Sequence, residues 1–454
     1  MNVLVKDREF YQRVLQIGVP IMIQNFLGQF LNMVDTIMVG RLGETEIAAV
    51  GIANQYFFFF HMVLIGICSG CGIFIAQYWG KRDTVNIKRI LGLGLSSVTV
   101  IALLFIAVGL SNPRMIIAIF NKETLILELG SQYLRIILLG YLFTAITFMF
   151  QSALRSIGNT VLPMFISVVG LVCNIVLNYA LIFGNLGMPA FGVQGAAIAT
   201  VIARIVETVG LILAVYLGKE VIAASMKEML DFTLAYVRDV FKTVTPVVLN
   251  DICWGLASIV YVAVYGRMGS QAVAAVQIGN TVNNLFMIVI FGLSAAASVM
   301  IGNSIGAGQV ELSKEYARKS IILSVLAGVT LGASLAVASP FIIRLFNISA
   351  AVAYSTQIIL YMMAAILAVR MVCIILITGV LRGGGDARQA LIIEGFTMWF
   401  IGVPLTLLGA FVFRFPIHLV YAMAMIEEIV KCILASIRVR SGRWMRDVTQ
   451  SVQS

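Results

Sequence analysis

The chain has 454 residues, of which 60% are hydrophobic and only 11% are charged, and its mean hydropathy is +1.00. Soluble domains carry about 25% charged residues, so this composition excludes a soluble domain and predicts an all-α polytopic membrane protein. The formal net charge of +10 would suggest a nucleic-acid partner only if the positions of the basic residues were ignored.

Apolar stretches long enough to cross a bilayer, about 20 residues each, occur along the whole chain. We expect about twelve transmembrane helices in two six-helix lobes, residues 1–218 and 241–454, joined by a cytoplasmic connector at residues 219–240. The expected spans are Val14–Met38, Ile47–Tyr78, Ile90–Leu110, Tyr133–Leu154, Leu162–Phe183, Val193–Leu217, Val244–Tyr265, Ala272–Ile305, Ile321–Phe341, Ala353–Leu381, Leu391–Phe411 and His418–Ile437. No cleavable signal pattern precedes the first span, so we expect the chain to begin at the mature N-terminus.

The two predicted lobes are copies of one another. Motifs recur in constant register, with about one residue gained late in the second copy; matched pairs include Pro20 with Pro246, Arg41 with Arg267, Gly66 with Gly292 and Arg155 with Arg382. An even number of spans per copy makes both copies enter the membrane in the same direction. We therefore expect a parallel tandem repeat, related by an axis along the membrane normal. Two facing bundles leave a cleft between them, which favours a transporter over a receptor.

Lysine and arginine residues are concentrated on one side of the expected spans. That side carries Lys6, Arg8, Arg13, Lys81, Arg82, Lys88, Arg89, Arg155, Lys219, Lys227, Arg238, Lys242, Lys314, Arg318, Lys319, Arg382, Arg388, Arg438, Arg440, Arg443 and Arg446; the other carries Arg41, Arg114, Lys122, Arg267, Arg344 and Arg414. Basic residues favour cytoplasmic loops, so we expect both termini and the connector in the cytoplasm. The positive charge therefore reflects topology, and a nucleic-acid partner is excluded.

The first expected span contains one carboxylate, Asp35, about four turns after Pro20. A charge at the bilayer centre costs roughly 2.5–3.5 kcal/mol on insertion scales. Asp35 is therefore a candidate ion or proton site; the alternative is a structural carboxylate held by neighbouring amides. In the second copy Tyr261 takes its place. Pro20 removes a backbone hydrogen bond and is a candidate hinge in the first helix.

Polar partners for Asp35 are expected from the fifth and sixth spans. Asn174 and Asn178 lie one helical turn apart and share a face, so both amides can point at one ion. The alternative for this pair is hydrogen bonding between packed helices. The sixth span has a small-residue face that reaches Thr200, which we expect to be a further neighbour of the site.

Few other titratable residues fall within the spans. Asp251, five residues after Pro246, is a candidate second-lobe polar site. Arg204 and Glu207 are three residues apart on one helix, so we expect them to pair. The other acids are Glu394, Glu427 and Glu428, and the other bases are Arg135 and Arg370. Whether Asp251, Glu207, Glu394 or Arg370 contributes to a substrate site stays open at this point.

Motifs of enzymes and metal centres are absent from the sequence. It has two histidines and no HExxH, GxSxG or phosphate-binding glycine loop. The six cysteines all fall within apolar segments, where a small buried thiol is the ordinary role. We therefore expect a protein that is not an enzyme, with no cofactor, no disulfide framework and no dedicated metal site.

Several short motifs occur in order along nearly the whole chain. They are Val34-Asp35-Thr36 with Val39-Gly40-Arg41-Leu42-Gly43, Ala153-Leu154-Arg155 with Gly158-Asn159-Thr160, Asn174 with Asn178-Tyr179, Gly195 to Thr200, Leu381-Arg382-Gly383, and Glu427-Glu428 with Arg443-Trp444. In combination, these motifs resemble those of bacterial transporters of the multidrug and toxic compound extrusion (MATE) family.

The resemblance implies a secondary antiporter in the bacterial inner membrane that exports small organic, often cationic, compounds by alternating access, in exchange for H⁺ or Na⁺. In many bacterial members the first-helix aspartate works with a fifth-helix Asn-x-x-x-Asp pair. Asp35 and Asn174 match that pattern, whereas Asn178 stands where an acid is often found, which weakens the expectation of a strong Na⁺ site at Asp35. We expect coupling in the first lobe and a monomer surrounded by lipid.

One alternative belongs to the same superfamily, a lipid-linked saccharide flippase. Such proteins usually have more spans and a more cationic cavity, and Arg135, Arg204 and Arg370 favour this alternative.

Overall fold

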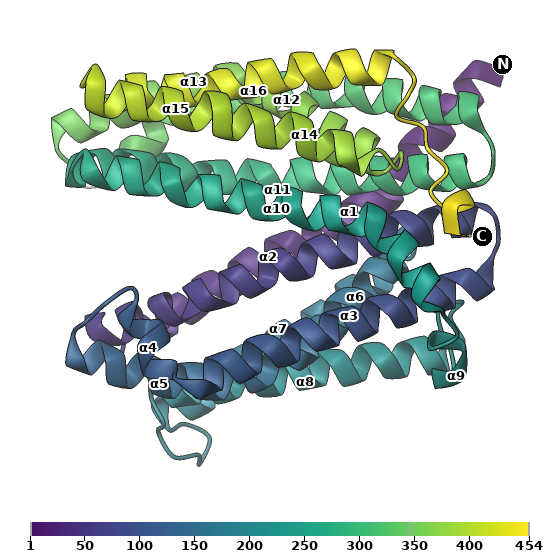
Figure 1. The fold of residues 1–454 in the computed structure, drawn as a ribbon. Helices are drawn as coiled ribbons and strands as arrows, with labels where there is room; N and C mark the ends of the chain where they lie inside the picture. Colours follow the sequence, from purple (N-terminus) through teal and green to yellow (C-terminus); the bar gives the residue numbers. More distant parts are fainter. Residues whose placement is uncertain (1, 345, 347, 453–454) are drawn as a thin grey trace. The chain divides into compact units, whose positions relative to one another are not determined.

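The computed structural model describes residues 2–344, 346 and 348–452, with side chains from residue 8 onward. Within this part of the chain all regular structure is helical, which confirms the predicted all-α fold class (Figure 1). Ten of the described helices are long and apolar enough to cross a membrane, or eleven if one bent pair counts as a single span.

Two of the twelve expected spans are not among these ten helices. The fourth is the bent pair, α5 (Thr124–Ile137) and α6 (Leu139–Ser156), whose axes meet at 48°. The last corresponds to α16 (Ile417–Arg440), which is long enough but contains Glu427, Glu428 and Lys431. With α16, the arrangement agrees with the expectation of about twelve.

Packing divides the chain into two units. The N unit is Ile23–Phe241, and the C unit combines Met1–Met22 with Lys242–Ser454. The division expected from the sequence placed residues 1–22 with the first half, whereas their packing groups them with the second. Consequently α1 (Asn2–Gly40) begins in the C unit and continues in the N unit. The helix α10 (Leu234–Arg267) does the reverse, since its residues up to Phe241 pack in the N unit.

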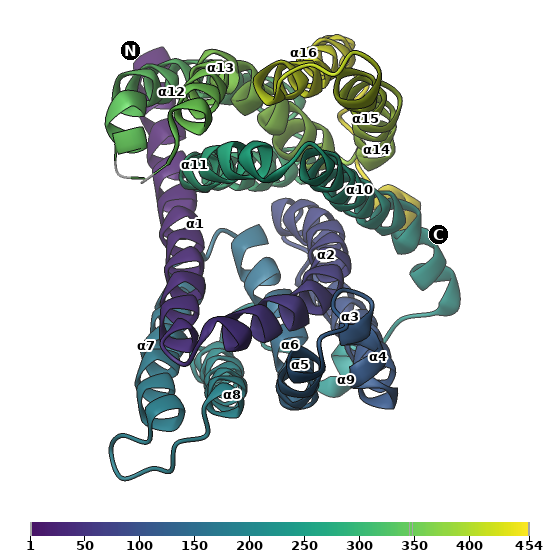
Figure 2. The same ribbon diagram turned by 90° about the vertical axis from the view of Figure 1, so that its left-hand side faces the viewer.

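The N unit contains the second part of α1 and eight further helices. These are α2 (Glu44–Gly80), α3 (Thr84–Ser111), α4 (Pro113–Ala118), α5, α6, α7 (Val161–Phe183), α8 (Val193–Leu217) and α9 (Met226–Met229). Helices α7 and α8 pack side by side, as both views show (Figures 1 and 2). This pairing brings the expected fifth and sixth spans together.

Two salt bridges join the polar segment between α8 and α10 to the start of α3. Lys88 donates to Glu228 at 2.7 Å, and Arg89 pairs with Asp231. Ser225 and Glu228 form a capping box at the start of α9. The hydrogen bond from Lys88, aided by those from Ser225, lowers the pKa of Glu228 to about 2, so this pair stays ionised at neutral pH.

The C unit contains the start of α1 and the remaining helices. These are α10, α11 (Ser270–Gly306), α12 (Val310–Arg344), α13 (Ala350–Ile374), the π-helical segment η1 (Ile375–Arg382), α14 (Ala387–Thr397), the π-helical segment η2 (Met398–Gly402), α15 (Val403–Leu407), the π-helical segment η3 (Leu408–Val412), α16 and the short 3₁₀ segment η4 (Gln450–Val452). Helices α12 and α13 pack side by side in both views (Figures 1 and 2).

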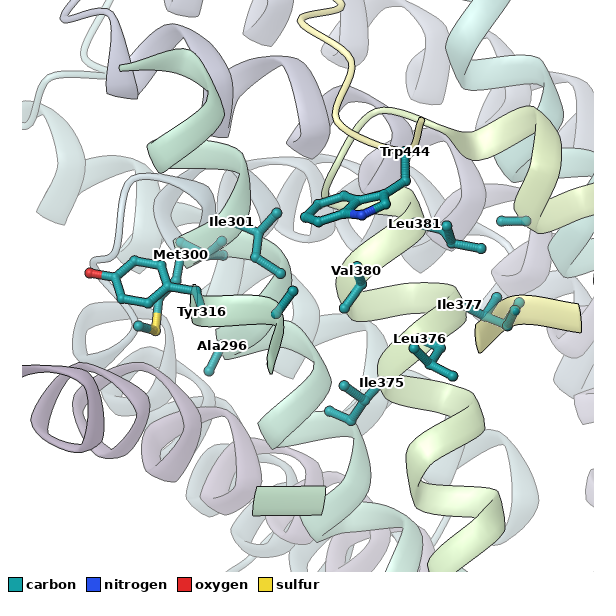
Figure 3. Close-up of a cluster of buried hydrophobic side chains, with 14 of the residues drawn as sticks. Ala296, Met300, Ile301, Tyr316, Ile375, Leu376, Ile377, Val380, Leu381 and Trp444 are labelled. Carbon is teal, nitrogen blue, oxygen red and sulfur yellow. The ribbon is translucent and has the colours of Figure 1, made fainter. Parts of the chain in front are cut away.

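The largest apolar core of the C unit joins both ends of the chain. Figure 3 shows Trp444, from the segment after α16, among Ile301, Val380 and Leu381. Four residues of α1 complete this core: Phe10, Val14, Ile17 and Ile21. Helix α1 approaches α11 closely, because a Cβ added to Gly18 would lie 3.3 Å from the carbonyl oxygen of Gly292. The start of α1 is therefore a built-in part of the C unit.

Candidate functional site

Asp35 lies in the part of α1 that belongs to the N unit, on an apolar helix, and its side chain is partly buried. Its nearest polar partner comes from α7. The Nδ2 of Asn178 donates a hydrogen bond of 2.6 Å to Oδ1 of Asp35. Two helices separated by most of the N unit's sequence thus meet at the one carboxylate of the first expected span, Val14–Met38.

The hydrogen bonds continue from Asn178 to the neighbouring helix α8. Asn178 Nδ2 also donates to Oδ1 of Asn174 at 2.7 Å, and Asn174 Nδ2 donates to Oγ1 of Thr200 at 3.3 Å. The Thr200 hydroxyl in turn donates to the backbone oxygen of Ala196 at 2.9 Å. Both asparagines are only 1% exposed. The structure thus brings the four predicted residues together in one chain of hydrogen bonds.

One buried oxygen of this group has no hydrogen-bond partner. Both donors of the Asn178 amide are used, whereas its Oδ1 is buried and has no hydrogen-bond partner. A network that served only to hold helices together would satisfy its buried acceptors. An unpartnered oxygen beside a carboxylate suits a donor or a cation that is present only part of the time.

The expected pair between Arg204 and Glu207 is confirmed, with Nη1 and Oε2 2.8 Å apart. Glu207 is buried, and its other oxygen accepts from Ser167 at 3.0 Å and from Gln151 at 3.2 Å. Every oxygen of this carboxylate is therefore satisfied by the N unit itself. Glu207 and Arg204 form a structural ion pair rather than a free charge.

Asp251, the candidate polar site of the second half, is held by an arginine. Its Oδ1 accepts from Nη2 of Arg382 at 2.6 Å. The neighbouring Asn250 accepts from the same nitrogen at 2.8 Å and donates to Glu394 at 2.7 Å. Sequence reasoning treated Arg382 only as a topological charge and did not foresee this pairing.

A second group of buried charges lies in the C unit and was also missed. Tyr261, the repeat partner of Asp35, donates to Oε2 of Glu427 at 3.2 Å. Lys431 lies 3.6 Å from Glu427 and 3.8 Å from Glu428. A Cβ on Gly402 would overlap the hydroxyl of Tyr261 and the carboxylate of Glu427, so a larger residue there would displace these two side chains. The repeat register, which places Tyr261 opposite Asp35, was the available clue to this group.

Arg370 also has partners within the C unit. Its Nη1 donates to Asn283 at 3.0 Å, and its Nε lies 3.6 Å from Glu428. With Lys431 and the two glutamates, this makes a group of two positive and two negative side chains.

The described residues contain no group of three or more histidine, cysteine or acidic side chains that could hold a metal ion. Any ion bound near Asp35 would therefore use one carboxylate together with amide and hydroxyl oxygens. Pro20 is buried within α1, which continues through it as a helix.

A family model described as MatE matches residues 20–180 and 246–408, more than half of the chain. The chain belongs to the MatE family. The two matched segments begin at Pro20 and Pro246, the same point of the two predicted copies. The family consists of membrane transporters, so this MatE protein is a transporter and not an enzyme. The resemblance noted in the sequence is thereby confirmed.

Curated MatE relatives match nearly end to end. A probable multidrug resistance protein NorM of Thermotoga maritima is 26% identical over 451 residues, which cover 98% of this chain and 95% of the relative. An uncharacterized transporter YisQ of Bacillus subtilis is 26% identical over 436 residues, which cover 94% and 93% of the two chains. A solved structure described as MATE in the bent conformation has a TM-score of 0.85 at 19% identity, over 98% of this chain and 97% of that one. That likeness shows a shared fold.

Proposed function

We propose that this protein is a secondary antiporter that exports small organic, often cationic, compounds in exchange for H⁺ or Na⁺ by alternating access. The observation that carries the proposal is the hydrogen-bonded group of Asp35, Asn178, Asn174 and Thr200 in an apolar bundle, with one acceptor left open. The name of the Thermotoga maritima relative, a probable multidrug resistance protein, supports the kind of cargo.

In the proton-coupled form of this proposal, the orientation of the Asn178 amide depends on whether Asp35 is ionised or protonated. Ionised Asp35 accepts from Asn178 Nδ2, as the geometry has it. Protonated Asp35 becomes a hydrogen-bond donor, and the open acceptor beside it is Asn178 Oδ1. Rotation of the amide would then break the bond to Asn174, the residue of α7 that donates to Thr200 of α8. Proton uptake is in this way linked to helix packing.

Sodium is the second coupling ion that the group could hold. Hard cations take oxygen ligands, and Asp35, Asn178 Oδ1 and the Thr200 hydroxyl supply three oxygens. Only one of the three is charged. A proton needs only the Asp35 carboxylate, whereas a sodium ion would need further oxygen ligands besides these three. The experiment below distinguishes the two ions.

Electrical balance also follows from the stoichiometry. Export of one monovalent cation against one inward H⁺ or Na⁺ moves no net charge, so the membrane potential, worth about 2.3 kcal/mol per charge per 100 mV, contributes nothing. A neutral cargo would make the same exchange sensitive to voltage.

The flippase alternative predicts uncompensated positive charge in the bundle. Arg204 is paired with Glu207, and Arg370 contacts Asn283 and Glu428. Two of the three arginines that favoured a flippase are therefore neutralised within their own units. The third, Arg135, is exposed near the end of α5.

We further propose a monomer in the bacterial inner membrane with both termini in the cytoplasm. The distribution of lysine and arginine supports this orientation. We also retain the repeat boundaries, residues 1–218 and 241–454, as the two inherited copies, while α1 and α10 each begin in the opposite packing unit.

The test is efflux of a fluorescent organic cation from vesicles that contain the purified protein. A pH gradient and a sodium gradient are imposed separately, with protein-free vesicles as control. Acceleration by one gradient identifies the coupling ion. Movement of cargo that neither gradient changes would contradict the antiporter proposal.

Replacing Pro20 should slow transport without weakening cargo binding. Pro20→Ala restores a backbone donor and stiffens α1 two residues before Met22, where the helix leaves the C unit. We expect the maximal efflux rate to fall a few-fold and the cargo dissociation constant to stay within about twofold, since less than 0.5 kcal/mol separates such values. An unchanged rate would leave Pro20 with a packing role alone.

A further inference from the structure

The two arginines of the repeated Leu-Arg motif lie inside the helical units. Arg155 lies in the last turn of α6, and Arg382 ends η1 and is only 7% exposed. The sequence alone, which places each before a glycine-containing turn, suggested loop residues. Their guanidinium groups instead reach the first helix of their own copy.

In the N unit the contact runs through three helices. Arg155 Nη2 donates to Oε1 of Gln24 in α1 at 3.0 Å. The other end of the same amide, Gln24 Nε2, donates to Oγ of Ser167 in α7 at 2.9 Å. One amide is therefore held from both sides, by α6 and by α7.

In the C unit the same chain of bonds recurs. Arg382 Nη2 donates to Oδ1 of Asn250 in α10 at 2.8 Å. Asn250 Nδ2 donates to Oε2 of Glu394 in α14 at 2.7 Å. Asn250 is completely buried. All three residues are the repeat partners of those in the N unit.

The two hydrogen bonds of the amide recur although its side chain and its acceptor have changed. The N unit uses a long amide, Gln24, with a short acceptor, Ser167. The C unit uses a short amide, Asn250, with a long acceptor, Glu394. The loss of a methylene from the amide is offset by the longer acceptor, so the first helix is held at the same point in both units. Such compensation indicates that the contact matters more than the residues that make it.

The held amide follows a proline by one helical turn in each copy. Gln24 comes four residues after Pro20, and Asn250 four residues after Pro246. It also lies beyond the place where the helix changes units, two residues after Met22 in α1 and nine residues after Phe241 in α10. Upstream of this place the helix packs in one unit, and downstream the arginine pins it to the other.

We propose that Arg155 and Arg382 are positioning residues that fix the downstream arm of α1 and α10 to its own unit, so that movement between the units bends each helix in the short segment beside its proline. This inference deepens the proposed alternating access and rests on it. The bend is confined to residues 20–24 in α1 and 242–250 in α10. Without the arginine contact, the downstream part of the helix would slide along its own unit when the units move. The movement would then no longer open and close the transport pathway.

The test exchanges the C-unit pair for the N-unit pair. Asn250→Gln and Glu394→Ser are made singly and together. Each single change mismatches the two lengths, and the double variant Asn250→Gln/Glu394→Ser restores a long amide with a short acceptor. Glu311→Ser, on the exposed start of α12, is the matched control for loss of a surface glutamate.

The first readout is the shape of α10, which does not depend on any cargo. Spin labels replace the exposed Leu234 and Leu256 in a background without the native cysteines. A straight helix would separate them by about 33 Å, at 1.5 Å per residue. We expect a narrow distance distribution in the parent, broadening in both single variants and in Arg382→Lys, and narrowing again in the double variant. Single variants as narrow as the parent would overturn the inference.

The second readout is efflux in the vesicle assay. We expect each single variant to slow transport about fivefold or more, because the downstream arm of α10 is no longer held, with cargo affinity near the parent's. The double variant should recover most of the rate. A double variant as slow as Glu394→Ser would show that the Glu394 charge itself is needed, and would also overturn the inference. Failure of the parent to transport would instead refute the proposed function, and the spin-label distances would still decide whether Arg382 and Asn250 hold α10 in place.

Discussion

Replacing Asp35 with asparagine should abolish gradient-driven export while leaving the protein folded in the membrane. The amide keeps the size of the side chain and its contact with Asn178, which lies 2.6 Å away, but it can neither take up a proton nor carry a charge. A gradient of one pH unit sustains about a tenfold concentration ratio of cargo by one-for-one exchange, or about 1.4 kcal/mol. In Asp35→Asn this ratio should fall to that of protein-free vesicles.

The measurement is cargo accumulation in vesicles at a fixed imposed gradient. Glu44→Gln, an exposed residue at the start of α2, is the matched control, because it also removes one carboxylate and should keep the parent's ratio. Export at near the parent rate in Asp35→Asn would remove Asp35 from the coupling site.

Changing Asn178 to aspartate should make transport sensitive to sodium. The new carboxylate would lie beside Asp35 and one turn from Asn174, so the site would carry a second negative charge. Two adjacent carboxylates repel each other unless a cation or proton lies between them, and a second charged ligand strengthens an oxygen site for a metal cation. We expect the efflux rate of Asn178→Asp to rise steeply with sodium at fixed pH, and that of the parent to depend on it less.

Asp251→Asn is the comparison for this prediction. Asp251 is engaged by Arg382, and the asparagine can still accept a hydrogen bond, so we expect transport to fall only modestly. An inactive Asp251→Asn beside an unaffected Asn178→Asp would move the coupling site to the second half of the protein.

The Asp35 group could be predicted because each step applied a general rule to residues that are visible in the sequence. A carboxylate in an apolar span is costly, and Asn174 and Asn178 share a helix face by periodicity alone. Their meeting needed only that α7 pack near α1. The unpartnered Asn178 oxygen could not be predicted, because it depends on the orientation of the amide, whose two N–H groups donate to Asp35 and Asn174.

Arg155 and Arg382 show where sequence reasoning failed. A Leu-Arg pair before glycines is typical of a cytoplasmic turn, and the positive-inside rule gave the arginines a sufficient role. Nothing local indicates a partner on the first helix. The repeat register did contain the information, since Gln24 and Asn250 also correspond, but only the structure shows that these side chains meet their arginines.

The change of units within α1 and α10 was equally hidden. Residues 1–22 are covalently part of the first copy, yet Phe10, Val14, Ile17 and Ile21 bury their side chains in the core of the C unit. Repeat analysis follows the order of the chain and not its packing. The buried group around Glu427 was not predicted for a related reason, because Tyr261, which donates to Glu427, lies on a different helix.

Reciprocal coupling tests the central claim, that ion and cargo exchange at Asp35, most directly. An outward gradient of organic cation is imposed on vesicles at equal pH and sodium, and the inward movement of H⁺ or Na⁺ is recorded with a pH-sensitive dye or a sodium tracer. We predict cargo-driven ion uptake by the parent and none by Asp35→Asn. Undiminished ion uptake by Asp35→Asn would contradict the account.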